Sequence, residues 1–190
     1  MKAQARVLGV DDGPFAFTDE HVTVVGVVVR APSYVEGVLT TRVRVDGTDA
    51  TEALATAIGR SRYREGLALV LLDGAALGGF NVVDIDALHE AIRVPVATVT
   101  REEPDLQAME LVLRWKFADW EARLAILHRH PLMKVETAHK PLYATAVGLE
   151  PAALREAIRM CTVRGALPEP VRIAHLVATA IVKGESKGNA

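Results

Sequence analysis

Two aspartates in this chain each stand directly after a largely apolar run that has the length of a strand. Asp11 follows residues 6–10, and Asp73 follows residues 67–72. Continuous apolar runs of this kind are typical of strands that are buried on both faces. If these two strands are neighbours, their ends share one edge of the sheet and the two carboxylates lie close together. We therefore expect Asp11 and Asp73 to hold a divalent metal ion.

Carboxylates at this spacing indicate a specific chemistry. Mg²⁺ prefers oxygen ligands and binds phosphates when a few carboxylates hold it. Two such ions stabilise both the attacking and the leaving oxygen when a phosphodiester bond is broken. The competing interpretation is that Asp11, Asp46 and Asp73 stand before glycines or in turns, where aspartate is common because it bonds the local backbone. For any one of these aspartates considered alone, the turn interpretation is favoured over the metal interpretation.

A further group of carboxylates opens the helix that follows the third expected strand. Asp46 and Asp49 lie near the same edge of the sheet as Asp11 and Asp73, and we expect them to complete the set of ligands. Asp49 and Glu52 have the spacing of a capping box, so Glu52 is predicted to cap the helix.

The first third of the chain predicts three strands. Residues 6–10, 22–30 and 38–45 are rich in β-branched side chains and are separated by short turn segments. Connections this short favour antiparallel pairing, so we expect a three-stranded meander.

The middle of the chain alternates between helix and strand. Residues 49–61 and 81–92 have the pattern of helices, whereas residues 67–72 and 94–100 have the pattern of buried strands. Such alternation favours parallel pairing. The expected fold class is α/β, with a ribonuclease-H-like mixed five-stranded sheet, flanking helices and C-terminal additions.

The last third predicts mainly helices. Apolar residues recur every three or four positions over residues 106–127, which indicates one long helix, or two that break near Trp115, packed on the core. A strand over residues 142–147 and a helix from Pro151 follow. The final helix, residues 171–182, places Arg172 and His175 on one side, where a lone histidine is more often a surface group than a ligand.

Composition limits the classes of function. The chain has 190 residues with 22 basic and 24 acidic side chains, and half of its residues are hydrophobic. This length predicts a single domain over residues 1–190. The one cysteine, Cys161, permits no internal disulfide, so we expect the protein in the cytoplasm. No run reaches the about 20 apolar residues of a membrane span. The weak net charge predicts that any basic groove is local or is assembled between subunits of a homo-oligomer.

Several strings of residues resemble a known family. They are residues 9–15, 45–51, 72–74, 79–85, 168–175 and 184–188. These strings are similar to those of a largely archaeal family of unknown function, of the UPF0215 type, in which some members are named endonuclease dU. The resemblance covers essentially the whole chain. That family is in turn distantly related to endonuclease V, a metal-dependent enzyme that cleaves nucleic acid near deaminated bases.

The resemblance implies roles for individual residues. Asp11 and Asp73 match two catalytic aspartates of endonuclease V, and Tyr34 resembles a tyrosine that separates the strands beside a damaged base. An ordinary loop position is the alternative for Tyr34. The catalytic glutamate of endonuclease V falls on Val43, so its role passes to Asp46, Asp49 or Glu52, or is lost.

Two further positions differ from endonuclease V. The histidine that follows a Val-Gly pair in that enzyme falls on Leu149, and an acid of its last helix falls on His175. The base pocket and the ligand geometry are therefore expected to differ from those of endonuclease V.

We thus hypothesise a nuclease that depends on Mg²⁺ or Mn²⁺ and acts on nucleic acid, with DNA favoured over RNA, at uracil or hypoxanthine in DNA repair. Arg42, Arg44 and Lys187 are candidate phosphate contacts. The main alternative is a non-catalytic nucleic-acid-binding or regulatory protein that retains the fold. A nucleotide binder of the sugar-kinase or actin type is disfavoured, because it needs two copies of such a fold.

Overall fold

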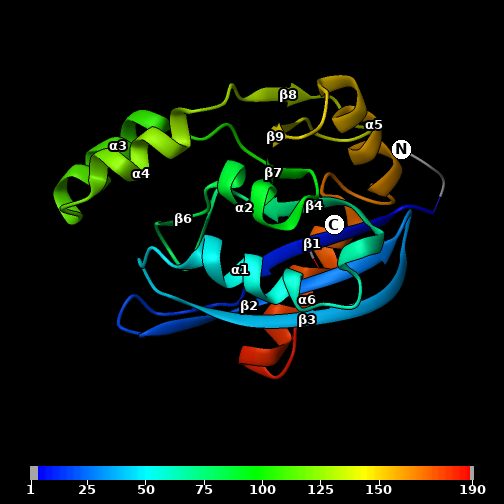
Figure 1. Ribbon diagram of the computed structural model, residues 1–190, viewed down its shortest axis with the longest axis horizontal. Helices are drawn as coiled ribbons and strands as arrows, with labels where there is room; N and C mark the ends of the chain where they lie inside the picture. The colour runs from blue at the N-terminus through cyan, green and yellow to red at the C-terminus, as the bar shows by residue number, and fades with distance from the viewer. Residues whose placement is uncertain (1–3, 189–190) are drawn as a thin grey trace.

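Seven strands form the main sheet of the computed structural model, which describes residues 4–188 (Figure 1). Their order across the sheet is β3-β2-β1-β4-β7-β9-β8. Their bounds are Arg6–Asp12 (β1), His21–Arg30 (β2), Tyr34–Arg44 (β3), Leu67–Asp73 (β4), Val96–Thr100 (β7), Met133–Val135 (β8) and Leu142–Val147 (β9). A separate two-stranded ribbon pairs β5 (Ala76–Leu77) with β6 (Asn81–Val82).

The strand pairing confirms the ribonuclease-H-like arrangement of five strands, namely β1, β2, β3, β4 and β7. β1, β2 and β3 form the antiparallel meander, while β4 lies parallel to β1 and β7 lies parallel to β4. The expected count of five is too low for the described residues, because β9 pairs with the outer edge of β7 and β8 pairs with β9. These added strands cover an edge that would otherwise expose unpaired backbone groups.

Helices cover both faces of the sheet. α1 (Ala50–Gly59) and α2 (Ile85–Ile92) bury their apolar sides with Leu8 and Val10 of β1. α5 (Pro151–Cys161) and the start of α6 (Glu169–Lys183) pack on Val7 of β1 from the opposite face. Successive side chains of a strand point to opposite faces. The side chain of each strand residue therefore points either toward α1 and α2 or toward α5 and α6.

One glycine decides how closely α6 approaches the sheet. A Cβ atom at Gly9 would lie 2.0 Å from the carbonyl carbon of Pro170, so a side chain there would collide with the backbone of the helix. The absence of a side chain at Gly9 therefore allows the first turn of α6 to rest directly on β1.

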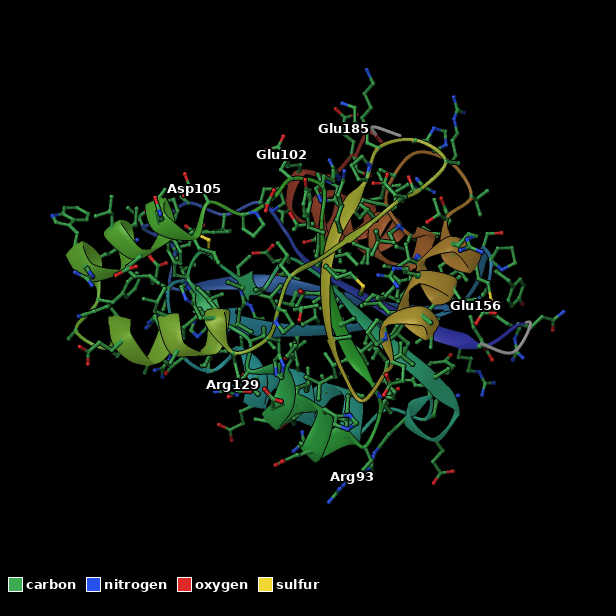
Figure 2. All side chains as sticks on the ribbon, turned by 90° about the horizontal axis from the view of Figure 1, so that it is seen from above. Arg93, Glu102, Asp105, Arg129, Glu156 and Glu185 are labelled. Carbon is green, nitrogen blue, oxygen red and sulfur yellow. The ribbon has the colours of Figure 1, made fainter. Side chains whose placement is uncertain are left out.

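Two helices, α3 (Leu106–Lys116) and α4 (Trp120–His128), form a helical hairpin that extends beyond the sheet. Figure 2 shows Asp105 and Arg129, at the two ends of this hairpin, near the body of the molecule. The break after Lys116 confirms the two-helix alternative. The side chains that recur along the hairpin all face inward, but only Leu113 is buried, and the others are half-buried: Leu106, Met109, Phe117, Trp120, Leu124 and Leu127. Trp115, at the expected break, lies outside this stripe and is 85% exposed.

Arg123 fastens the hairpin to the rest of the molecule. This side chain is buried, and its Nη1 atom donates to the carbonyl oxygens of Gly47 and Phe80 at 2.9 and 2.5 Å. Its guanidinium also lies 4.2 Å from the centre of the Phe117 ring. Cys161 is buried, as expected of a core residue. Within residues 4–188, the helices are all too short or too polar to cross a membrane.

Candidate metal centre

Asp11, Asp73 and His175 come together at the carboxyl ends of β1 and β4. One potential ligand atom from each lies within 4.8 Å of the other two. Val10 pairs with Leu72, so the residues that follow them, Asp11 and Asp73, stand at the same level on adjacent parallel strands. The structure therefore brings together the two aspartates that the sequence singled out.

The direction of each side chain follows from the alternation along the strands. Asp11 is two residues beyond Gly9, and Asp73 is two residues beyond Leu71, whose side chain packs on the layer of α5 and α6. Both carboxylates therefore face α6. Because Gly9 lets that helix rest on β1, His175 reaches the carboxylate, with its Nδ1 atom 2.7 Å from Oδ2 of Asp11.

Burial and mutual repulsion dominate the electrostatics of this group. Burial, followed by the charges of Asp73 and Asp12, raises the pKa of Asp11 to about 8. Burial also raises the pKa of Asp73, against the opposing charges of Arg101 and His175. A divalent cation would offset this repulsion, because carboxylates that are costly to ionise alone are stabilised by a nearby positive charge.

Asp12 faces the other layer. Its Oδ2 atom accepts a hydrogen bond from the backbone of Gly78 at 2.6 Å, and burial raises the pKa of its carboxyl. Asp12 therefore holds the segment between β5 and β6 against the end of β1. Its backbone N–H donates to Oδ1 of Asp11 at 2.8 Å, which orients the first carboxylate of the group.

Asp46 is not part of this group. Its Oδ1 atom accepts from the backbone N–H of Phe80 at 2.9 Å, and its Oδ2 atom pairs with the ammonium group of Lys116. Asp46 thus links the end of β3 to the segment around Phe80 and to α3. The sequence placed it near the correct edge of the sheet, but its charge already has a cationic partner.

Asp49 also lies outside the group. Its carboxylate accepts from the backbone N–H of Arg44 at 3.1 Å and from Nδ2 of Asn81 at 2.7 Å. The predicted capping box with Glu52 is wrong, since the Asp49 side chain caps no N–H group of α1. Val43, the position that matches the endonuclease V glutamate, is fully buried on the layer of α1 and α2.

Tyr34 lies at the opposite end of the sheet. It pairs with Arg30, which in turn pairs with Arg6 at the start of β1. Asp11 lies level with Thr40, six residues further along β3, which corresponds to about 20 Å at 3.3 Å per residue. The Tyr34 side chain is 68% exposed, so a strand of nucleic acid would have to span this length to contact both.

The three candidate phosphate contacts occupy two places. Arg42 and Arg44 are exposed on β3, just beyond the level of Asp11. Lys187 is exposed in the segment after α6. That segment turns back along the helix, because a Cβ at Gly188 would lie 3.5 Å from Nη1 of Arg172.

An apolar hollow of about 500 Å³ begins at Gly74, the residue after Asp73. It lies between the sheet and the helical hairpin. Its lining includes Thr98, Thr100 and Thr145 of the sheet and Leu106, Met109 and Leu127 of the hairpin. A cavity of this size is within the range that accepts a small organic group.

Two residues at this end of the molecule have no role that the sequence predicts. In the sequence, His175 shares a helix side with Arg172 and, in the resemblance to endonuclease V, falls on an acid of the last helix, while Arg101 is a charged residue after β7. The ends of parallel strands share one edge, so the position of Arg101 directly after a strand is a usable signal. The contact of His175 depends on the close packing of α6, which no local pattern reveals.

Comparison with known proteins gives consistent matches over nearly the whole chain. The family model described as endonuclease dU matches residues 3–182. A UPF0215 protein of Methanothermobacter thermautotrophicus is 41% identical over 191 residues, covering 100% of this chain and 94% of the relative. Another from Thermococcus gammatolerans is 43% identical over 190 residues, covering 98% and 96%.

Solved structures show the same fold. A protein of unknown function from Archaeoglobus fulgidus superposes with a TM-score of 0.86 at 36% identity, covering 94% of this chain and 99% of that one. The catalytic domain of human endonuclease V gives 0.58 at 18% identity, covering 95% and 83%. Endonuclease V of Ciona intestinalis, in complex with DNA containing an inosine, gives 0.56 at 15% identity, covering 90% and 82%.

Proposed function

Because the chain belongs to the endonuclease dU family, we propose that it is a divalent-metal-dependent nuclease that hydrolyses phosphodiester bonds in nucleic acid. The observation that carries this proposal is the group formed by Asp11, Asp73 and His175. The buried carboxylate of Asp11 and the half-buried carboxylate of Asp73, both with raised pKa values, face one imidazole at the end of the sheet where open α/β folds bind their ligands.

The donor set suits Mn²⁺ as well as Mg²⁺. Carboxylates bind either ion, and an imidazole nitrogen favours the softer Mn²⁺ over Mg²⁺. When bound, such an ion lowers the pKa of a coordinated water and stabilises charge on a phosphate. Asp11 and Asp73 would supply the anionic oxygens. The backbone N–H of Asp12 keeps the Asp11 carboxylate in place, and Asp46 and Asp49 hold the neighbouring segment.

For the substrate we propose DNA that carries a deaminated base. The apolar hollow beside Asp73 is large enough for a base that has left the stack, and enzymes that read single bases hold them against apolar side chains. The fold shared with an endonuclease V bound to DNA containing an inosine supports this choice of substrate. In this proposal Tyr34 contacts the strand far from the metal, and Arg42, Arg44 and Lys187 contact its phosphates.

A cleavage assay tests the proposal. The substrates are labelled single- and double-stranded oligonucleotides, either plain or carrying uracil or hypoxanthine, with Mg²⁺, Mn²⁺ or EDTA. The variant is Asp73→Asn, and the matched control is Glu90→Gln, which removes an exposed carboxylate from α2. We expect cutting that needs the metal, survives in the control and is lost in Asp73→Asn.

Two outcomes would contradict the proposal. Equal cutting by Asp73→Asn and the wild type would show that the ligand set is wrong. A folded protein that binds single-stranded DNA but neither Mg²⁺ nor Mn²⁺, and cuts no substrate, would indicate the non-catalytic binding protein.

A further inference from the structure

Four basic side chains gather around a second hollow, of about 300 Å³. They are Arg101, Lys140, Arg164 and Arg172, and His139 also lines the hollow. The segments that carry them are far apart in the sequence: the residue after β7, the loop between β8 and β9, the connection from α5 to α6, and α6 itself. In a chain with a net charge of −2, this concentration of positive charge is local.

Part of this positive charge is not compensated. Arg172 forms two hydrogen bonds, of 2.8 and 2.6 Å, with the buried carboxylate of Glu169. Arg101, Lys140 and Arg164 are exposed, and within residues 4–188 no carboxylate lies within ion-pair distance of them. Arg172 is paired with Glu169, and the charge of Arg101 acts on the nearby Asp73. Among the described residues, Lys140 and Arg164 are therefore the two cations of the hollow that no carboxylate compensates. Such a site attracts anions.

The loop that carries Lys140 is ordered by its own hydrogen bonds. The hydroxyl of Thr137 donates to the carbonyl oxygen of Lys140 at 2.7 Å and accepts from the backbone N–H of His139 at 3.1 Å. Gly165, on the other side of the hollow, has a φ of 76°, a conformation that favours glycine. The backbone around the hollow is therefore shaped before any ligand binds.

The hollow lies beside the candidate metal centre. Arg172 and His175 are three residues apart on α6, which is about 4.5 Å along the helix axis. Arg101 is close enough to Asp73 for its charge to lower the pKa of that carboxyl. The basic side chains and the carboxylates therefore adjoin one another at this end of the sheet.

We propose that this basic hollow binds a backbone phosphate of the substrate strand, next to the phosphate that is placed at Asp11, Asp73 and His175. Guanidinium groups suit this task, because they donate two parallel hydrogen bonds to phosphate oxygens. The inference rests on the proposed nuclease function and adds to it. The hollow fixes the register of the strand, whereas the carboxylates carry the reaction.

Binding without metal tests the hollow separately from catalysis. A short fluorescein-labelled single strand is titrated in EDTA, with anisotropy as the readout, against the wild type and the double variant Lys140→Gln/Arg164→Gln. Loss of one phosphate contact should weaken binding about tenfold and make the slope of log K against log salt less negative by about 0.7. The loss should be the same for different base sequences, because phosphate contacts carry no sequence information.

Matched variants separate the loss of a phosphate contact from a general loss of positive charge and from unfolding. Arg60→Gln/Arg93→Gln removes two exposed positive charges, as the double variant does, and should bind as the wild type does. These residues lie at the ends of α1 and α2, which cover the opposite face of the sheet from α6. Lys140→Arg keeps the charge and should retain affinity. Circular dichroism checks that the double variant is folded, and Arg101→Gln, alone, should reproduce part of the loss.

The outcomes separate this inference from the proposed function. If Lys140→Gln/Arg164→Gln binds as tightly as Arg60→Gln/Arg93→Gln while the wild type still cuts DNA, the hollow is not a phosphate site and the nuclease assignment stands. If the wild type never cuts but the double variant loses affinity, the nuclease fails and the hollow stands. A strong preference for strands with a 5′-terminal phosphate would replace the internal phosphate by a terminal one and overturn the proposal.

Discussion

A carboxylate with little exposure to water lies near each end of β1, Glu36 of β3 at one end and Asp11 at the other, and their pKa values shift in opposite directions. At the amino end, Glu36 receives hydrogen bonds from Arg6 at 2.7 and 2.6 Å and from Arg30 at 3.0 Å. The hydrogen bonds from Arg6 contribute most to a pKa of about 2 for Glu36. At the carboxyl end, burial and two neighbouring acids raise the pKa of Asp11 to about 8.

The difference lies in the neighbours, since both carboxyl groups are largely shielded from water. The side chain of Glu36 is 19% exposed and that of Asp11 is 7% exposed. The negative charge of Glu36 is compensated by two guanidinium groups at contact distance. Asp11 has Asp73 and Asp12 close by, with one imidazole at contact distance. An end whose charges are compensated stabilises the fold, and an end whose charges are not compensated is prepared for a ligand.

The largest expected effect is at the carboxyl end. Asp73→Asn should lower the rate of cleavage by about 10³-fold or more, because it removes an anionic oxygen from the metal group. The same change removes a repulsive charge, so the Tm without metal should rise, by about 2–4 °C for each kcal/mol relieved. Cleavage assays check that the rate falls, and thermal melts in EDTA check that the Tm rises. A fall in Tm would mean that the Asp73 charge is compensated in the folded protein.

Metal binding should stabilise the wild type by the next largest amount. An ion present at 100 times its Kd contributes about 2.7 kcal/mol, which corresponds to about 5–10 °C in Tm for a domain of this size. His175→Ala should reduce this shift, whereas Asp46→Asn should retain it, because Asp46 bonds Phe80 and Lys116. Thermal melts with and without Mn²⁺ measure the shift. The reverse result for the two variants would restore Asp46 to the ligand set.

At the amino end, Glu36→Gln should lower the Tm at pH 7 by a few degrees, because it leaves Arg6 and Arg30 without their counter-charge. The folded-state pKa of Glu36 lies below its ordinary value of 4.5. Its contribution is therefore complete above about pH 5 and is lost as the pH falls toward 2. The Tm difference between variant and wild type should shrink over that range. A difference that does not depend on pH would show that charge is not its cause.

The smallest effect is expected for Tyr34→Ala, since the side chain is exposed at the amino end. The Tm should stay within about 2 °C of the wild type. Cleavage beside a deaminated base should fall by less than about tenfold, and cleavage of plain strands should not change. Competition between the two substrates in one tube measures this preference. Unchanged preference would identify Tyr34 as an exposed residue of β3 with no part in the choice of substrate.

The fold was predictable where local pattern decides structure. Runs of β-branched residues placed the strands of the meander, and the apolar run before Asp73 correctly indicated a central strand. Asp11 and Asp73 were identified for the same reason, because each marks the end of such a run. The exposed side of the helical hairpin was not predictable, since the spacing of Leu106 and Met109 is the same whether a helix packs on a sheet or on a second helix.

The rest of the site depends on contacts between distant parts of the chain. Asp46 and Asp49 look like ligands in the sequence, but their partners Phe80 and Asn81 lie more than thirty residues away. His175 joins Asp11 across 164 positions, through a helix that a single glycine admits to the sheet. The sequence pattern alone shows which carboxylates lie near one edge of the sheet. It does not show which of them are already paired with a cation or a hydrogen-bond donor from a distant part of the chain.

The helical hairpin is attached to the rest of the molecule by few contacts, so it should unfold locally before the sheet does. α3 packs on α4, and the hairpin is joined to the rest of the molecule mainly by polar contacts. These include the ion pair of Lys116 with Asp46 and the hydrogen bonds of Arg123 to Gly47 and Phe80. Segments with few buried contacts unfold locally at a lower free energy than the core. Amide hydrogens of α3 and α4 should therefore exchange with deuterium well before those of β1 and β4. Since the hairpin forms one wall of the apolar hollow, that wall can open without unfolding the sheet that carries the carboxylates.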